Sequence, residues 1–176
     1  MLTRKRSSRR KYTLYMIIAA CWAVLIFILS SQTHNRQNLQ PWLQQHLPIT
    51  AIEKHFASFE FYYGREKISM KDSGAAGLIE FLIRKLAHVV EYAILGGLLF
   101  QLLRKGLRFS VSISFFLALL FCVLYASSDE IHQLFTAGRN PKMADVYLDT
   151  AGACLGMSLV SLFSWIRSRK RGKAIE

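Results

Sequence analysis

Four long apolar stretches divide the chain, and each has about the length that a helix needs to cross a bilayer. Residues 12–31 and 109–127 contain no charged side chain, and both predict spanning helices of the required ~20 residues. Residues 86–103 and 144–165 are equally apolar apart from a few His and acidic residues. Because no polar stripe repeats along these two stretches, spanning helices fit them better than helices that cover a soluble core. The pattern predicts an all-α fold, an integral membrane bundle of four transmembrane helices.

The segment 32–77 separates the first two spans and carries mixed charges and several aromatic residues. It is too apolar for a plain linker and too short for an independent domain. We expect an extracytoplasmic segment that covers the outer ends of the helices or lies along the membrane interface, which Trp and Tyr favour. Within it, Pro41 and Pro48 enclose residues that predict a short turn of helix.

The second helix is predicted to start before its apolar run. The sequence Lys71-Asp-Ser-Gly is typical of a helix start, with Asp72 or Ser73 as the N-cap. The helix would then begin near Gly77, above the membrane. Residues 78–165 are predicted to form a core of three helices.

Composition and charge predict how the four helices are oriented in the membrane. Of the 176 residues 52% are hydrophobic, yet the formal net charge is +12. Three segments, 1–11, 104–108 and 166–176, hold 14 basic residues and one acid, a net +13, while the remainder holds nine basic and ten acidic residues, a net −1. With four spans, these three segments lie on one side of the membrane. The positive-inside rule then places both termini in the cytoplasm.

The same numbers exclude several classes of protein. A disordered chain would not be this apolar, and nucleic-acid binding would explain the charge but not the apolar stretches. We therefore expect a multi-pass protein of the cell membrane that binds no nucleic acid. Attraction of the basic segments to anionic lipids is expected as a secondary effect.

The first span also allows a second interpretation, that of a cleaved signal peptide. Ile18-Ala-Ala-Cys21 resembles a lipoprotein cleavage box, but the apolar run continues from Trp22 to Leu29, which favours an uncleaved helix. The three cysteines, Cys21, Cys122 and Cys154, lie inside predicted spans, and their spacing fits neither a disulfide framework nor a zinc site. We interpret them as small apolar core residues, and we expect no metal or cofactor.

Ionisable residues interrupt the second span on one helical face. Lys85, His88 and then Glu91 or Tyr92 follow one another at three- and four-residue steps. From Lys85 to Glu91 the helix rises about 9 Å, so Glu91 lies well below the outer surface. A carboxylate there costs at least a few kcal/mol if it faces lipid. Glu91 is therefore interpreted either as part of a structural ion pair or as a functional site.

The third span ends in a polar sequence. Glu130 and Gln133 share one face and are expected to continue inward, because apolar residues follow them. Asp129 and His132 share a neighbouring face and are interpreted as a polar cap at the surface. In the turn that follows, Arg139 offers a planar fork suited to a carboxylate or a phosphate.

The fourth span opens with acids and continues with glycines on the same face. Asp145, Asp149, Gly152 and Gly156 follow one another at steps of four, three and four. Asp145 near the helix start suits the helix dipole, and the Gly-xxx-Gly spacing predicts the close approach of another helix. The topology gathers the polar residues of all three spans near the outer surface. This favours recognition or chemistry there over a continuous ion path.

The combined spacing of these motifs resembles the VanZ-like membrane protein family, which is named for an accessory determinant of teicoplanin resistance. The motifs are Lys-xx-His-xx-Glu-Tyr, Asp-Glu-xx-Gln-x-Phe, a Gly-Arg turn and Asp-xxx-Asp-xx-Gly-xxx-Gly, within about residues 82–160. The resemblance maps the polar positions of the family onto nine residues: Lys85, His88, Glu91, Tyr92, Glu130, Gln133, Arg139, Asp145 and Asp149. At position 149 many members have Asn. The resemblance implies an effect at the cell envelope and an influence on glycopeptide susceptibility, and no defined reaction.

Three functions stay open at this point. The first, which we favour, is a non-enzymatic envelope protein whose outer polar cavity binds a lipid-linked cell-wall intermediate or an anionic head group, with Lys85, His88 and Arg139 holding phosphate. The second is an intramembrane hydrolase or transferase that acts on a lipid phosphate, with His88, Glu91 and Glu130 as catalytic candidates, or with the carboxylates holding a divalent metal instead. The third is a purely structural polar network. The expected partners are membrane lipids.

Overall fold

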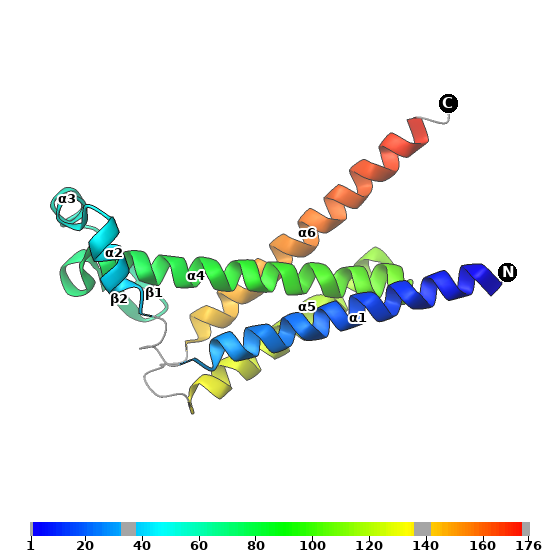
Figure 1. Ribbon diagram of the computed structural model, residues 1–176, viewed down its shortest axis with the longest axis horizontal. Coiled ribbons are helices and arrows are strands. Elements are labelled where there is room, and N and C mark those ends of the chain that lie inside the picture. The colour runs from blue at the N-terminus through cyan, green and yellow to red at the C-terminus, as the bar shows by residue number, and fades with distance from the viewer. Residues whose placement is uncertain (1, 33–37, 136–141, 174–176) are drawn as a thin grey trace.

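The computed structural model describes residues 2–32, 38–135 and 142–173. Four long helices dominate it: α1 (Leu2–Ser30), α4 (Met70–Gln101), α5 (Val111–Gln133) and α6 (Met143–Lys173) (Figure 1). Each contains a stretch long and apolar enough to cross a membrane. The prediction of a mostly helical chain with four apolar spans is therefore confirmed.

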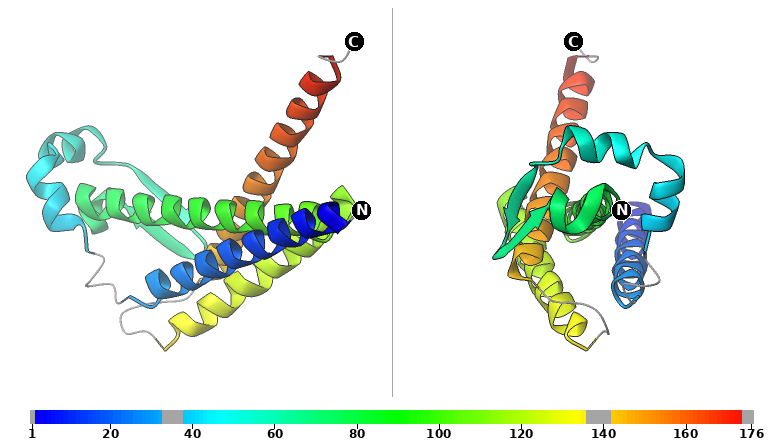
Figure 2. Two further views of the ribbon diagram at one scale, coloured as in Figure 1. Left: turned by 45° about the vertical axis from the view of Figure 1, so that its right-hand side comes forward. Right: turned by 90° about the vertical axis from the view of Figure 1, so that its left-hand side faces the viewer.

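Helix α4 is the centre of the bundle. Helices α1 and α5 lie along it, whereas α6 crosses it and then diverges, so that the second half of α6 leaves the bundle (Figures 1 and 2). The start of α1 and the end of α6 lie toward the same end of the bundle as the last residues of α4 (Figure 1). The contact between α4 and α6 near their crossing is the one that positions most of the polar residues.

Glycines make that crossing close. A Cβ atom added at Gly156 would lie 1.9 Å from the carbonyl oxygen of Ala93, and one added at Gly152 would lie 2.6 Å from the carbonyl oxygen of Val89. Only a residue without a side chain fits at these two positions of α6. The close helix approach predicted from the Gly-xxx-Gly spacing is confirmed.

An apolar core lies at the level of this crossing. Tyr92 and Leu95 of α4 pack there with Cys122 of α5 and Met157 of α6, all of them fully buried. Cys154 is partly buried, but Cys21 is exposed on α1. The expectation that all three cysteines lie in the core is wrong for Cys21, because that side of α1 faces outward from the bundle.

The segment between the first two spans forms two short helices, α2 (Gln40–His46) and α3 (Ile49–His55), and a hairpin of β1 (Glu60–Tyr63) and β2 (Glu66–Ser69). Helix α2 confirms the predicted turn of helix between the prolines. The hairpin was not predicted. Its two-residue loop begins at Gly64, whose φ of +62° favours glycine. The strands run beside α4 back to the start of α6 (Figure 2).

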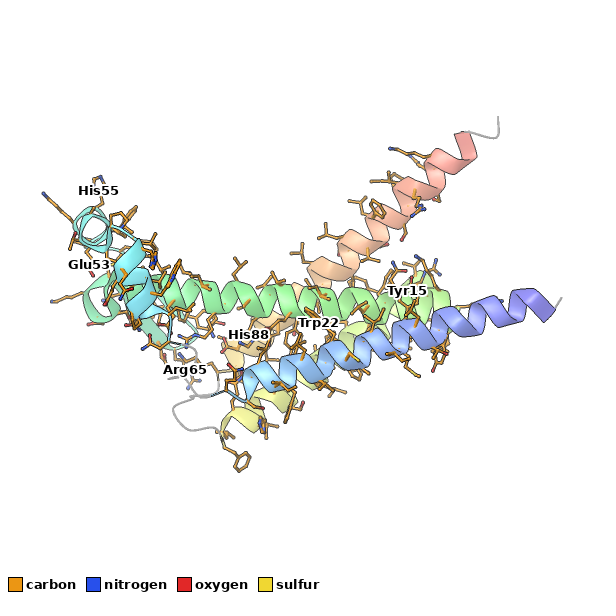
Figure 3. The ribbon with its side chains drawn as sticks, viewed as in Figure 1. Tyr15, Trp22, Glu53, His55, Arg65 and His88 are labelled. Carbon is orange, nitrogen blue, oxygen red and sulfur yellow. The ribbon has the colours of Figure 1, made fainter. Side chains whose placement is uncertain are left out.

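Helix α4 starts earlier than expected and contains a break. Its N-cap is Ser69, whose hydroxyl accepts a hydrogen bond from the Asp72 backbone N–H at 3.1 Å, so the prediction of Asp72 or Ser73 as the cap is wrong. Gly74 then adopts a non-helical φ of +65°. After this break the Ala75 N–H donates to Glu53 of α3 at 3.1 Å. Figure 3 labels Glu53, which lies near the start of α4. The carboxylate of α3 thus caps the long part of α4.

Candidate functional site

Polar side chains from three elements meet where α6 begins. Lys85 Nζ of α4 lies 2.5 Å from Asp145 Oδ1 of α6. The Tyr63 hydroxyl of β1 donates a hydrogen bond to the same oxygen. Both members of the ion pair are largely shielded, with 15% of the Lys85 side chain and 9% of the Asp145 side chain exposed. The hairpin, α4 and α6 are therefore joined through one carboxylate.

Tyr63 is the one member of this group that lies outside the spanning stretches. Burial, and then the hydrogen bond to Asp145, raises the pKa of the Tyr63 hydroxyl well above its usual value. The hydroxyl therefore keeps its proton and acts as a donor to the carboxylate.

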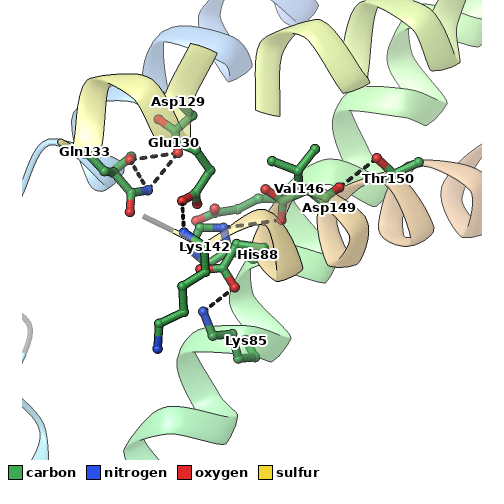
Figure 4. Close-up of polar contacts among 12 residues, drawn as sticks. Lys85, His88, Asp129, Glu130, Gln133, Lys142, Val146, Asp149 and Thr150 are labelled. Carbon is green, nitrogen blue, oxygen red and sulfur yellow. Dashed lines mark hydrogen bonds and ion pairs between the residues drawn. The ribbon is translucent and has the colours of Figure 1, made fainter. Parts of the chain in front are cut away.

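A second pair lies one turn deeper, between His88 of α4 and Asp149 of α6. His88 Nδ1 lies 3.3 Å from Asp149 Oδ1 (Figure 4). Both side chains are buried, Asp149 to 1% exposure. Neither atom makes a well-formed hydrogen bond to any described residue. We call these five residues, Tyr63, Lys85, His88, Asp145 and Asp149, the α4–α6 network.

A separate group of hydrogen bonds fastens α1 to the end of α5. The Ser30 hydroxyl donates to Asp129 Oδ2 at 2.8 Å, and Gln133 Nε2 donates to both, at 3.0 Å each. Asp129 is buried, so its interpretation as a surface cap is wrong: α1 covers it. Gln133 and Glu130 are also buried, which confirms that they continue inward.

Glu130 tethers the chain where α6 starts. Its Oε2 accepts a hydrogen bond from the Lys142 backbone N–H at 2.6 Å. The Lys142 ammonium in turn pairs with Glu66 of β2. A carboxylate at this position also suits the helix dipole of α6. These contacts hold the tip of the hairpin against the ends of α5 and α6.

A cavity of about 320 Å³ lies between the end of α1 and α4. Four polar residues of α4 line it at helical spacing: Glu80, Arg84, His88 and Glu91. Arg84 Nη2 lies 3.5 Å from Glu80 Oε1. The remaining lining includes Ser30 and Gln32 near the end of α1, with the apolar residues Leu29, Leu39, Ile83 and Ala87. We call this space the α1–α4 cavity.

The structure divides the set of nine residues predicted from the sequence. Lys85, His88, Asp145 and Asp149 come together in the α4–α6 network. Glu130 and Gln133 lie at the end of α5, in the neighbouring groups of contacts. Glu91 lines the α1–α4 cavity, and its backbone carbonyl accepts a hydrogen bond from Trp22.

Tyr92 and Arg139 stand apart from the other seven. Tyr92 is fully buried in the apolar core, where its hydroxyl has no hydrogen-bond partner among the described residues. Arg139 lies outside the described residues.

Residues of these groups that were not anticipated from the sequence include Ser30, Tyr63, Glu80, Arg84 and Lys142. The spacing of Glu80, Arg84, His88 and Glu91 on one helical face was a usable signal for Glu80 and Arg84. The other three belong to elements whose position relative to α4 no local pattern specifies.

Few of the described side chains are arranged for catalysis or for metal binding. Within the described ranges, no group of three or more His, Cys, Asp or Glu residues is arranged to hold a metal ion. Ser31 Oγ lies 3.2 Å from His132 Nε2, a distance typical of a nucleophile and its base. However, the Ser31 hydroxyl donates its proton to the Phe27 carbonyl at 2.6 Å. In this arrangement the Ser31 proton points to the Phe27 carbonyl and away from His132.

A family model described as VanZ/LLP1 matches residues 15–164 of the chain. This range includes the α4–α6 network, the α1–α4 cavity and the contacts at the end of α5. No curated protein and no solved structure shows significant similarity to the chain.

Proposed function

This chain belongs to the VanZ/LLP1 family, as the spacing of its polar residues predicted, and we propose that it is a non-enzymatic membrane protein that binds an envelope lipid. The head group of an anionic or lipid-linked envelope component would occupy the α1–α4 cavity. The observation that carries this proposal is the lining of that cavity, which joins four ionisable residues of α4 to an apolar wall.

The size and the two-sided lining of the cavity suit part of an amphiphile. A volume of about 320 Å³ is at the lower end of the range of small-molecule sites, which starts at about 300 Å³. Leu29, Ile83 and Ala87 offer a surface for the first carbons of an acyl or prenyl chain. A fully water-soluble ligand would gain nothing from this wall.

The charges of the lining favour a head group that carries more than a phosphate. Arg84 presents a planar fork of donors that matches phosphate oxygens. Glu80 and Glu91 would repel a bare anion but accept hydrogen bonds from hydroxyl or ammonium groups. A sugar phosphate or an amino-containing phosphate on a lipid satisfies both requirements.

The phosphate-binding role expected for Lys85 needs revision. Its ammonium lies against Asp145 and over the ring of Tyr63, 4.9 Å from the ring centroid. Removing it from this pair would leave a buried carboxylate without its cation, which costs several kcal/mol. Arg84, one residue earlier on α4, takes over the phosphate role in our proposal, because it lines the cavity, its contact to Glu80 is longer at 3.5 Å, and 25% of its side chain is exposed.

A structural role is the second candidate for the α4–α6 network itself. Lys85 and Asp145 are already paired with each other, and both lie away from the cavity lining. This arrangement favours a scaffold that fixes α6 and the hairpin against α4. Only His88 belongs to both the network and the cavity.

An effect on glycopeptide susceptibility would follow if the bound lipid is a cell-wall intermediate. Cells that produce the wild-type chain would then differ in susceptibility from cells that produce a cavity variant at equal protein level. If the two were equally susceptible, the cavity would have no effect on glycopeptide susceptibility, and the lipid-binding proposal would still stand.

Identification of the lipids that co-purify with the full chain tests the proposal. We expect a specific anionic or lipid-linked species to accompany the wild type and to be lost in Arg84→Gln. The matched control is Arg65→Gln, which removes an exposed arginine in the hairpin loop. Equal lipid content in all three proteins would contradict a site at the α1–α4 cavity.

A further inference from the structure

A second cavity, of about 500 Å³, lies at the opposite end of the bundle, where α6 diverges from α4 and α5. It is bordered by the end of α4, the turn Leu102–Gly106, the start of α5 and the second half of α6. We call it the basic groove. Nine residues line it: Phe100, Gln101, Arg104, Lys105, Val111, Ser161, Ser164, Trp165 and Ser168.

The groove is positively charged. Arg104 and Lys105 belong to its lining, which contains no acidic residue. Arg104 Nη1 donates to the Phe109 carbonyl at 2.9 Å, which holds the guanidinium beside the groove. The start of α5 adds the positive end of a helix dipole, and the first turn of that helix contains no acid to offset it. All three contributions favour an anion.

The rest of the lining divides into a hydroxyl-bearing side and an apolar side. Ser161, Ser164 and Ser168 follow one another at steps of three and four, so they share one face of α6. Ser164 and Ser168 donate their own protons to backbone carbonyls of α6, which leaves their oxygens as acceptors. Phe100 and Val111 supply apolar surface.

Trp165 is of a residue type that favours a membrane interface. Its ring belongs to the groove lining, and Arg169 lies over it with the guanidinium carbon 4.1 Å from the ring centroid. Tryptophan and arginine both favour the region of lipid head groups. A ligand in the groove would therefore have its charged part at head-group depth and its apolar part toward the bilayer.

We propose that the basic groove binds one acidic phospholipid whose head group carries hydroxyls, as phosphatidylglycerol does. The phosphate is held by Arg104 and Lys105, the glycerol hydroxyls donate to the serines of α6, and an acyl chain follows Phe100 and Val111. This site is independent of the α1–α4 cavity and of any ligand bound there, since the two cavities share no lining residue.

Native mass spectrometry of the full chain in detergent, titrated with short-chain phosphatidylglycerol, tests this site. Phosphatidylcholine of the same chain length and inorganic phosphate are the comparison ligands. Lys105→Gln and Arg104→Gln together remove the two charges, and Ser164→Leu fills the groove without changing charge. The matched control is Arg167→Gln with Lys170→Gln, which removes two exposed charges of α6 outside the groove lining.

We expect one phosphatidylglycerol to bind more tightly than phosphatidylcholine. Loss of the two groove charges should weaken it about 30-fold, and Ser164→Leu should abolish it, while the control pair stays close to wild type. Lys105→Gln alone keeps the Arg104 contact to Phe109 and should give an intermediate loss. Equal weakening by the groove pair and the control pair would show a diffuse surface attraction and overturn the site. Binding of inorganic phosphate as tight as that of the lipid would also overturn it.

Discussion

His88 Nδ1 of α4 lies 3.3 Å from Asp149 Oδ1 of α6, and the same histidine lines the α1–α4 cavity. The pair therefore connects two parts of the molecule that otherwise share no residue. Both residues belong to the α4–α6 network, which fixes α6 and the hairpin, and His88 also forms part of the cavity wall. A change in the distance between α4 and α6 should thus reach the proposed lipid site through His88.

The glycine contact sets that distance, and Gly156→Ala is its most direct test. The new Cβ would lie 1.9 Å from the Ala93 carbonyl oxygen, so α4 and α6 must separate. We expect a loss of about 2 kcal/mol or more in the free energy of unfolding, measured by thermal unfolding in detergent. The control is Gly77→Ala, where the nearest atom is the Ser73 Cβ at 3.3 Å. Equal stability of the two variants would contradict the close packing.

The buried pair of Lys85 and Asp145 should behave as a unit. Lys85→Met and Asp145→Asn each leave one partner without its counter-charge, and each should cost about 3 kcal/mol of unfolding free energy. The double variant should cost at least about 1 kcal/mol less than the sum of the single changes. Unfolding of all four proteins in one detergent completes the cycle. Strictly additive losses would show that the two side chains do not interact.

Tyr63 should make stability depend on pH in the alkaline range. Its pKa in the folded protein is raised by burial and by the hydrogen bond to Asp145, whereas an unfolded chain has a pKa of about 10. The folded protein therefore binds this proton more tightly, and the contribution is complete below about pH 10 and lost as the pH rises further. The melting temperature of the wild type should fall more steeply above about pH 10 than that of Tyr63→Phe. Parallel curves would contradict the contact.

The hydrogen bonds of Ser30 should fasten the end of α1. Ser30→Ala removes a donor to Asp129 and an acceptor for Gln133 and leaves buried polar atoms behind. We expect a loss of about 1–3 kcal/mol. Ser128→Ala is the matched control, because its exposed hydroxyl contacts only the Tyr125 carbonyl of its own helix in the described structure. A loss of the same size in the control would mean that the buried contacts add nothing.

The four helices could be predicted because each depends on its own composition. An apolar run such as Val111–Gln133 needs no knowledge of its neighbours to be recognised as a span. The hairpin was missed because each strand has only four residues, too few to show an alternating pattern, although Phe61 and Ile68 pack against a small apolar cluster at the start of α4. The two-residue loop at Gly64 was its clearest local sign.

Of the site, only the grouping of residues that share one helical face could be predicted from the sequence. The steps from Lys85 to His88 and from Asp145 to Asp149 place each pair on one face, and the structure joins those faces. Spacing could not separate Glu91 from Tyr92, which are one residue apart: Glu91 lines the cavity and Tyr92 lies in the core. Glu80 is buried on α4 near Leu39 and the start of α2, where Gln40 lies beside Gly77. That packing depends on contacts far apart in the sequence.

Filling the α1–α4 cavity tests the central claim most directly. Ala87 lines the cavity, whereas Leu86 is 63% exposed and does not. Ala87→Trp and Leu86→Trp therefore place the same bulk at adjacent positions of α4 without changing charge. The measurement is the amount of the co-purifying anionic or lipid-linked species per protein, by quantitative mass spectrometry of folded samples. We predict that Ala87→Trp loses it and that Leu86→Trp retains it at the wild-type level. Retention by both variants would contradict a lipid-binding cavity between α1 and α4.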